Sequence, residues 1–231
     1  MRCLSRVAVV VLFAGVLAAA PPPVQDKNVQ RIAGWGEVID PDNDCKVTEE
    51  KGVLTITVPK THHDLTYQED GTKRNGPRVV QVTEGDFTFT VTLKGTPPPK
   101  NVTSSSGKYT YVSSGVLVWQ DEKNFARIER GEICHDGGTG PYTHVELFSD
   151  GKSVRGRRVE LGDADTAVRV TRKDKQFTFE VDPGAAGKNW TTVFSGEYTL
   201  EPKIRVGVLA LNTTTAEYAP QFSEVDLKRG K

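Results

Sequence analysis

Apolar and polar residues alternate along much of the chain. In Phe87–Leu93 every odd position is apolar and every even position is threonine, and Val53–Val58 and Phe177–Val181 show a similar alternation. A period of two in β-branched and aromatic residues is typical of strands that bury one face. The same criteria predict eight further strands: Arg78–Thr83, Gly115–Trp119, Phe125–Arg130, Thr143–Phe148, Val154–Leu161, Ala167–Arg172, Ile204–Leu211 and Phe222–Lys228.

Two of the predicted strands are apolar on both faces. Val116–Trp119 and Val206–Leu211 hold almost no polar residue, which is typical of central strands that are covered on both sides. Polar turns such as Asp150-Gly151-Lys152 separate the strands, and no amphipathic helix is evident. Many short strands with regular turns predict an all-β fold, a two-sheet sandwich or jelly roll.

The first 20 residues differ from the rest of the chain. Met1–Arg6 carries two arginines, Val7–Ala20 is almost wholly apolar, and Pro21–Pro23 follows. This order is typical of a secretory signal, and the apolar run is shorter than the roughly 20 residues that span a bilayer. We therefore expect a signal peptide over residues 1–20, a short linker over 21–30 and one domain over 31–231. An uncleaved membrane anchor is the alternative.

The charge balance argues against nucleic acid as a partner. The 231 residues hold 30 Lys and Arg against 30 Asp and Glu. Because the signal removes two arginines and no acid, 28 basic and 30 acidic side chains remain. A nearly neutral domain lacks the basic footprint of nucleic-acid binding proteins.

Export changes the interpretation of the three cysteines. Cys3 leaves with the signal, so Cys45 and Cys134 remain as a pair in an oxidising compartment. A disulfide between them would close a long loop and contribute about 4–5 kcal/mol in the chain-entropy description. Two free thiols are the alternative.

The order of short motifs resembles that of a known family. The motifs are Trp35, Asp40–Asp44, Leu54–Pro59, His63–Leu65, Asn75–Arg78 with Gln81, Gly85–Phe87, Gly115–Glu122 and Asn124–Arg130. In this order they resemble the uncharacterised bacterial family related to the "regulation of enolase" protein, in the concanavalin A-like lectin/glucanase superfamily. The resemblance covers roughly Trp35 to Leu227. It implies a jelly-roll sandwich of two curved antiparallel sheets, and little about activity.

The catalytic pattern of the superfamily's glucanases is missing. Those enzymes usually carry Glu-x-Asp-x-Glu on one strand, which aims three carboxylates into one cleft. No such triplet occurs here. Glu129 and Glu146 could still meet across neighbouring strands as a glycosidase pair, and surface ion pairs are the alternative.

A group of polar and aromatic residues suits a ligand on the concave sheet. Arg127 and Glu129 share one face of their strand, and charged groups hydrogen-bond sugar hydroxyls while aromatic rings stack on pyranoses. The candidate ligand-binding residues are Arg78, Trp119, Asp121, Asn124, Arg127, Glu129 and Glu146. A salt bridge on a solvated face is the alternative.

Metal sites receive weaker support. Asp40, Asp42 and Asp44 alternate as in calcium loops, but the sixth and twelfth positions of a helical calcium loop are Cys45 and Lys51 here. A looser calcium site competes with an Asx-rich turn, which we favour. The runs His62–Asp64 and His135–Asp136 offer no third ligand at a recognisable spacing, so we expect neither zinc nor a catalytic triad there.

Together these patterns predict an exported, non-catalytic β-sandwich that binds a carbohydrate or glycoconjugate in the periplasm, at the cell envelope or outside the cell. A glycan-cleaving enzyme and a structural or protein-binding envelope module are the alternatives. The pattern identifies no cofactor apart from the calcium candidate, and it leaves the oligomeric state open.

Overall fold

The computed structural model describes residues 29–65, 74–95, 98–100, 102–105, 110–134 and 140–230. The predicted signal over residues 1–20 and most of the linker over 21–30 lie outside the described residues, so these boundaries stay predictions. Among the described residues, no helix has the length and apolar character needed to span a bilayer.

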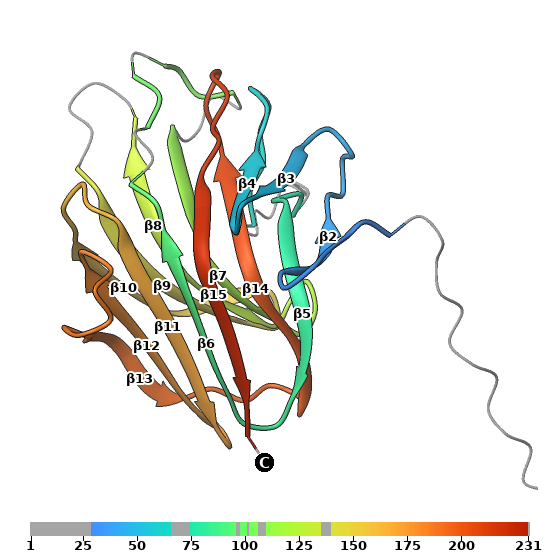
Figure 1. Cartoon of the computed structure of the whole chain (residues 1–231), viewed down its shortest axis with the longest axis vertical. Coiled ribbons are helices and arrows are strands. Elements are labelled where there is room, and N and C mark those ends of the chain that lie inside the picture. The colour runs from blue at the N-terminus through green and yellow to red at the C-terminus, as the bar shows by residue number, and fades with distance from the viewer. Residues whose placement is uncertain are drawn as a thin grey trace, which may run out of the picture.

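The described residues form two antiparallel sheets that lie face to face and are twisted and curved (Figure 1). The eight-stranded sheet contains, in spatial order, β1 (Arg31–Ile32), β2 (Gly36–Ile39), β5 (Arg78–Glu84), β14 (Lys203–Asn212), β7 (Tyr111–Trp119), β8 (Phe125–Ile133), β9 (Tyr142–Ser149) and β10 (Lys152–Glu160). The seven-stranded sheet contains β13 (Thr191–Glu197), β12 (Gln176–Pro183), β11 (Thr166–Lys173), β6 (Phe87–Leu93), β15 (Gln221–Arg229), β4 (Val53–Thr57) and β3 (Lys46–Glu50).

The predicted all-β sandwich is confirmed, and each of the eleven predicted strands is present. Four strands were not predicted, namely β1, β2, β3 and β13. They are short or bury little: in β3 only Val47 is buried, and in β13 only Val193. Without several buried positions, an edge strand leaves too weak an alternation to be recognised.

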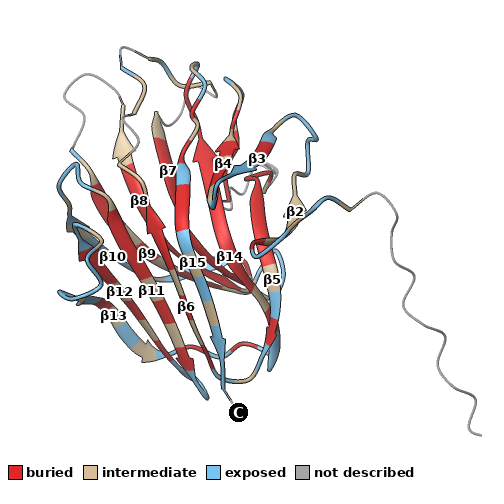
Figure 2. Cartoon of the chain, in the orientation of Figure 1, coloured by how far each residue is buried: buried red, intermediate tan, exposed pale blue. Residues whose placement is uncertain are grey.

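The main core lies between the two sheets. The alternating residues Phe87, Phe89, Val91 and Leu93 of β6 point into it, and the threonines between them point away or lie at the edge of the core. Full burial of such a side chain contributes about 1.5–3 kcal/mol. Figure 2 shows buried residues along the strands of both layers, with the exposed residues mainly at turns and ends.

The Tyr198 hydroxyl fastens one end of the sandwich. Tyr198 follows β13 of the seven-stranded sheet and is buried in the core. Its hydroxyl donates toward the carbonyl oxygens of Phe125 and Phe148, at 2.9 and 2.5 Å, on neighbouring strands of the other sheet. One side chain thus satisfies polar groups in a buried place and joins the layers.

The eight-stranded sheet is also covered on its outer face, which points away from the main core. In β7, Val116 and Val118 belong to the main core, whereas Leu117 and Trp119 belong to a second apolar cluster. The buried members of that cluster are Leu65, Leu117, Trp119, Phe125, Phe148, Leu209 and Leu211. The prediction that β7 and β14 are covered on both sides is therefore confirmed.

The cover over this face includes the connection between β4 and β5, which we call the crossing segment (residues 59–65 and 74–77). The backbones of His63 and Asn212, at the end of β14, exchange two hydrogen bonds of 2.8 and 3.0 Å. Leu65 is fully buried in the second cluster, and Gly76 N donates to Asp64 O at 3.1 Å. The crossing segment thus acts as a partial third layer.

Glycine lets the strands approach closely on the outer face. A Cβ on Gly207 of β14 would lie 2.0 Å from the Val79 carbonyl oxygen, and a Cβ on Gly115 would lie 2.1 Å from that of Ile128. Both contacts are with backbone atoms of the neighbouring strand, which cannot move aside as a flexible side chain can.

We expect Gly207→Ala to lower the free energy of unfolding by about 1–3 kcal/mol or more, because the sheet must shift to admit the methyl group. Urea-induced unfolding measures this change. Gly162→Ala is the matched control, since no atom lies within 4 Å of the Cβ that it adds. Equal stability of the two variants would show that the space between Gly207 and the Val79 carbonyl can admit a methyl group.

Candidate functional site

A buried guanidinium lies at the centre of the outer face of the eight-stranded sheet. Arg127 of β8 is 3% exposed, and its register partner on β9 is Glu146. The guanidinium contacts Glu146 Oε2 at 2.8 Å, Glu129 Oε2 at 3.5 Å and Asp64 Oδ1 at 3.9 Å. Two contacts are with strands of this sheet and the third is with the crossing segment.

Two hydroxyl groups add further polar contacts. Tyr111 of β7 donates its hydroxyl to Asp64 Oδ1 at 2.6 Å, and Ser113 donates to Glu129 Oε2 at 3.0 Å. We call the six residues Asp64, Tyr111, Ser113, Arg127, Glu129 and Glu146 the Arg127 cluster. It combines one guanidinium with three carboxyl groups.

Burial and neighbouring charges shift the pKa values of three residues in this cluster. Burial raises the pKa of Glu129, and the nearby Arg127 charge offsets only part of the shift. Burial alone would lower the pKa of Arg127, but Glu129 and the other acidic neighbours outweigh it, so the guanidinium stays charged. The Tyr111 pKa is raised well above its ordinary value, mainly by burial and then by Asp64, so its hydroxyl keeps the proton.

The Arg127 cluster reaches solvent along β9 and β10. The Glu146 side chain is 15% exposed, and that of His144, 3.9 Å from Glu129, is 28% exposed. Arg158 is paired in register with His144, and its guanidinium lies 3.7 Å from the centre of the Tyr142 ring. We call Tyr142, His144, Glu146 and Arg158 the polar rim. Gly156, opposite Glu146 on β10, lies against the His144 ring, since a Cβ there would be 3.2 Å from His144 Nε2.

Of the seven predicted ligand-binding residues, the structure brings together Arg127, Glu129 and Glu146. Arg78 and Trp119 form a separate pair, with the guanidinium 4.4 Å from the ring centre, and both are almost completely buried. Burial lowers the pKa of Arg78 to about 10.

The other two predicted residues shape a turn. Asp121 accepts hydrogen bonds from the backbone of Lys123 and from Asn124, and Asn124 accepts one from Asp150 N. These contacts connect β7 to β8 and do not point into the Arg127 cluster.

The predicted disulfide is wrong for this structure, because Cys45 and Cys134 are both free thiols. Cys45 precedes β3 in the seven-stranded sheet, whereas Cys134 follows β8 in the eight-stranded sheet. The Cys45 thiol lies beside Asp44, and the Cys134 thiol contacts the carbonyl of Glu132 two residues away. Each thiol is therefore directed toward its own loop.

The three alternating aspartates, our calcium candidates, hold different partners. Asp40 accepts a hydrogen bond from Cys45 N, Asp42 accepts one from Asn75, and Asp44 lies 2.9 Å from His63. Only Asp44 belongs to a group of metal-ligand side chains in the described residues.

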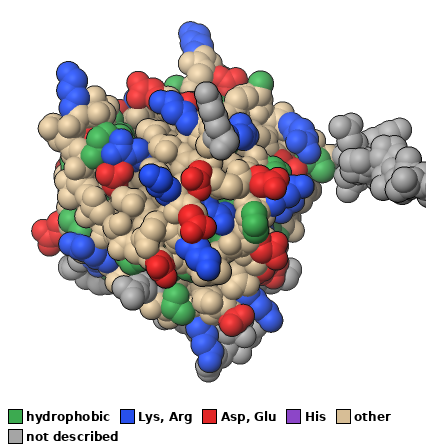
Figure 3. Space-filling model, turned by 90° about the horizontal axis from the view of Figure 1, so that it is seen from below, with side chains coloured by type: hydrophobic (Ala, Val, Ile, Leu, Met, Phe, Trp, Pro, Cys, Tyr) green, Lys and Arg blue, Asp and Glu red, His purple; other side chains and the backbone are tan. Residues whose placement is uncertain are grey.

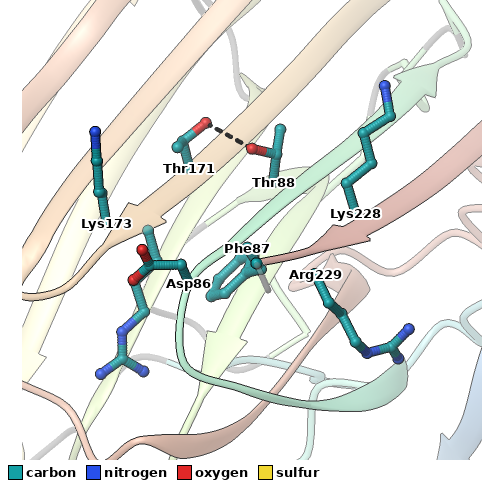
Figure 4. Close-up of a pocket in the computed structure, with 9 residues that line it drawn as sticks. Asp86, Phe87, Thr88, Thr171, Lys173, Lys228 and Arg229 are labelled. Atoms are coloured by element: carbon teal, nitrogen blue, oxygen red, sulfur yellow. Dashed lines mark hydrogen bonds between the residues drawn. The ribbon is translucent and has the colours of Figure 1, made fainter.

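Two cavities lie away from the Arg127 cluster. One, of about 180 Å³, is lined by Val82, Trp119, Gln120, Lys203, Ile204 and Arg205. The other, of about 270 Å³, lies where β6, β11 and β15 meet their turns. In Figure 4, Lys173 and Lys228 extend on either side of the hydrogen bond between Thr88 and Thr171. The Asp86 carboxylate there is engaged by Asp174 N at 2.7 Å.

The end of the sandwich shown in Figure 3 carries Lys and Arg side chains interspersed with Asp and Glu. This mixture agrees with the near-neutral composition, and no face of single charge is visible in that view.

Comparisons with known proteins show the fold. The chain is similar to a functionally unknown protein from Saccharomyces cerevisiae, with a TM-score of 0.65 and 19% identity, over 86% of this chain and 98% of that one. It is similar to a legume lectin-like domain from Entamoeba histolytica, with a TM-score of 0.52 and 9% identity, over 84% and 89% of the two chains. The predicted concanavalin A-like jelly-roll sandwich is thereby confirmed.

A third similar structure is a mutant of the GH43 protein BlXynB from Bacillus licheniformis, with a TM-score of 0.61 and 13% identity. The match covers 85% of this chain but only 37% of that protein, so most of that protein has no counterpart here. No protein-family model and no curated protein matches the chain.

The raised pKa of Glu129 predicts an unusual dependence of stability on pH. A carboxyl group with a raised folded-state pKa contributes stability below its ordinary value of 4.5, and this contribution is lost as the pH rises toward the raised value. Glu129→Gln cannot ionise, so we expect its free energy of unfolding to rise relative to that of the original protein as the pH increases above 4.5.

Urea-induced unfolding at a series of pH values measures this difference. Glu50→Gln, at an exposed position of β3, is the matched control and should show no such trend. If Glu129→Gln instead became less stable than the original protein as the pH rises, the charge of Arg127 would outweigh burial in setting the pKa of Glu129.

Proposed function

We propose that this chain is a non-catalytic carbohydrate-binding module that holds its ligand at the polar rim of the eight-stranded sheet. The observation that carries the proposal is the arrangement of Arg127. It fixes Glu129 and Glu146 on one face, and Glu146 remains partly open to solvent. Carboxylate, imidazole and guanidinium groups are the donors and acceptors that sugar hydroxyls require.

The burial of Glu129 supports binding rather than cleavage. Glu129 is 2% exposed and occupied by contacts to Arg127 and Ser113. A catalytic carboxyl group must come within hydrogen-bond reach of the atom it protonates or attacks. In this arrangement the glycan meets Glu146 and His144, and Glu129 holds Arg127 in place.

The likeness to a legume lectin-like domain supports the choice of a sugar as ligand, although a shared fold alone does not establish function. The proposal also includes export by the N-terminal signal, to the periplasm, the cell envelope or the exterior. Membership in the family related to the "regulation of enolase" protein, which the motif order suggests, is part of the same proposal.

A glycan-cleaving enzyme is the second candidate. Glu129 and Glu146 contact the same guanidinium, so they lie within the roughly 10 Å that separates glycosidase carboxyl groups. The raised pKa of Glu129 also suits a general acid. Release of reducing ends from oligosaccharides, lost in Glu129→Gln, would support this candidate over simple binding.

We expect Glu146→Gln and His144→Ala each to weaken glycan binding by about 10–100-fold, since hydrogen bonds to charged groups contribute roughly 1.5–3 kcal/mol. A glycan array identifies the ligand, and calorimetric titration then gives the affinity, with and without calcium. Glu197→Gln, on the exposed edge strand β13, is the control and should bind as the original protein does.

Absence of binding to any glycan by the folded protein, with and without calcium, would overturn the proposal and favour a structural or protein-binding module. Equal loss in Glu197→Gln would point to a general effect of charge rather than to the polar rim.

A further inference from the structure

Three side chains with metal-binding atoms meet where the loop before β3 touches the crossing segment. Asp44 and Cys45 come from the loop, and His63 comes from the crossing segment. Their carboxylate oxygen, sulfur and ring nitrogen atoms all lie within 4.8 Å of one another. No spacing in the sequence indicates this group, because its members are joined only by the packing of two loops.

The hydrogen bonds of His63 leave one ring nitrogen directed at Asp44. Nε2 lies 2.9 Å from Asp44 Oδ1, while Nδ1 lies 3.1 Å from the Thr61 carbonyl oxygen and 3.4 Å from the Thr61 hydroxyl. With the proton on Nε2, the neutral ring donates to Asp44 and Nδ1 can accept from the Thr61 hydroxyl. With the proton on Nδ1, the ring donates to the Thr61 carbonyl, and Nε2 presents a lone pair that can bind a cation beside Asp44.

The tautomer protonated on Nδ1 is the one that metal-binding histidines adopt. Such a histidine donates its second N–H to a carbonyl or carboxylate, which fixes the ring and turns the free nitrogen toward the metal. His63 is completely buried, so the ring is held firmly in this orientation. Thr61 also donates its hydroxyl to Asp44 Oδ2 at 3.3 Å, which orients the carboxylate as well.

A fourth oxygen lies nearby. Asp40 Oδ2 accepts the Cys45 backbone N–H at 2.8 Å, and Asp40 Oδ1 is buried with no hydrogen-bond partner. An unpartnered carboxylate oxygen in a buried place is normally compensated by a proton or a cation.

The mixture of donor atoms selects among metals. Calcium and magnesium prefer oxygen ligands alone, whereas sulfur, imidazole nitrogen and carboxylate oxygen together suit zinc. Donor atoms in a tetrahedral zinc site lie roughly 3.4–3.8 Å apart. The distance of 3.6 Å between Cys45 Sγ and Asp44 Oδ1 falls in this range, and the remaining distances need small shifts.

We propose that Asp44, Cys45 and His63 bind one Zn²⁺ ion, beside Asp40, which accepts a hydrogen bond from the Cys45 backbone. The site is separate from the Arg127 cluster, but the next residue after His63 is Asp64, which contacts Arg127 and Tyr111. Zinc therefore ties the loop before β3 to the crossing segment and helps to hold Asp64 over the sheet.

Metal binding by the full chain tests the proposal. The protein is stripped with a chelator and titrated with Zn²⁺ by calorimetry, and in parallel with Co²⁺, whose thiolate charge-transfer absorption reports a sulfur ligand. We expect one Zn²⁺ per chain, a rise in melting temperature on its addition and a thiolate band with Co²⁺.

Four variants make the test specific. Cys45→Ser should lose the thiolate band and most of the affinity, whereas Cys134→Ser, which removes the other described thiol, should keep both. Thr61→Val, at an exposed position outside the ligand set, should weaken binding by about 10–100-fold through loss of the contact that orients Asp44. His63→Gln should lower the affinity further.

No retained Zn²⁺ in the folded native protein would overturn the proposal, as would unchanged affinity in Cys45→Ser. In that event His63 and Asp44 form a hydrogen bond without a metal between them. Loss of glycan binding has no bearing on this outcome, since the readouts are metal stoichiometry and the Co²⁺ spectrum.

Discussion

The buried charge of Arg127 is the constraint on which the outer face of the eight-stranded sheet depends. A charge removed from water is tolerated only when opposite charges and hydrogen bonds surround it, and loss of one partner typically costs about 3–5 kcal/mol. Arg127 finds its partners on β8, on β9 and in the crossing segment. The same ion pairs of Arg127 therefore hold both the crossing segment and the site in position.

Much of the fold follows from patterns that the sequence displays locally. Period-two alternation identifies β6 because Phe87, Phe89, Val91 and Leu93 all enter one core. Apolar residues on both faces of β7 and β14 indicate a second covering layer, and the structure contains one. Edge strands such as β3 are missed because a single buried valine leaves no periodic signal.

The site is less predictable for a geometric reason. Strand parity places Arg127 and Glu129 on one face, and the register of β8 with β9 adds Glu146. Alternation along β7 could also have placed Tyr111 and Ser113 on the outer face, because both lie on the same side of the strand as Leu117. Asp64 arrives through a connection between the two sheets, and no periodicity reports where such a connection lies. Trp119 is predicted to face a sugar, but it is buried and the Arg78 guanidinium lies over its ring.

The crossing segment also bears on how the molecule behaves in concentrated solution. Leu65 covers a surface that contains Leu117, Leu209 and Leu211, and aromatic rings continue it toward β9. A broad apolar sheet face left open to water is an association surface, on which a second sheet can stack. Because the chain folds over that face itself, these side chains are kept out of water. A cut within the segment would thus expose them and favour association between copies before it disturbed the sandwich itself.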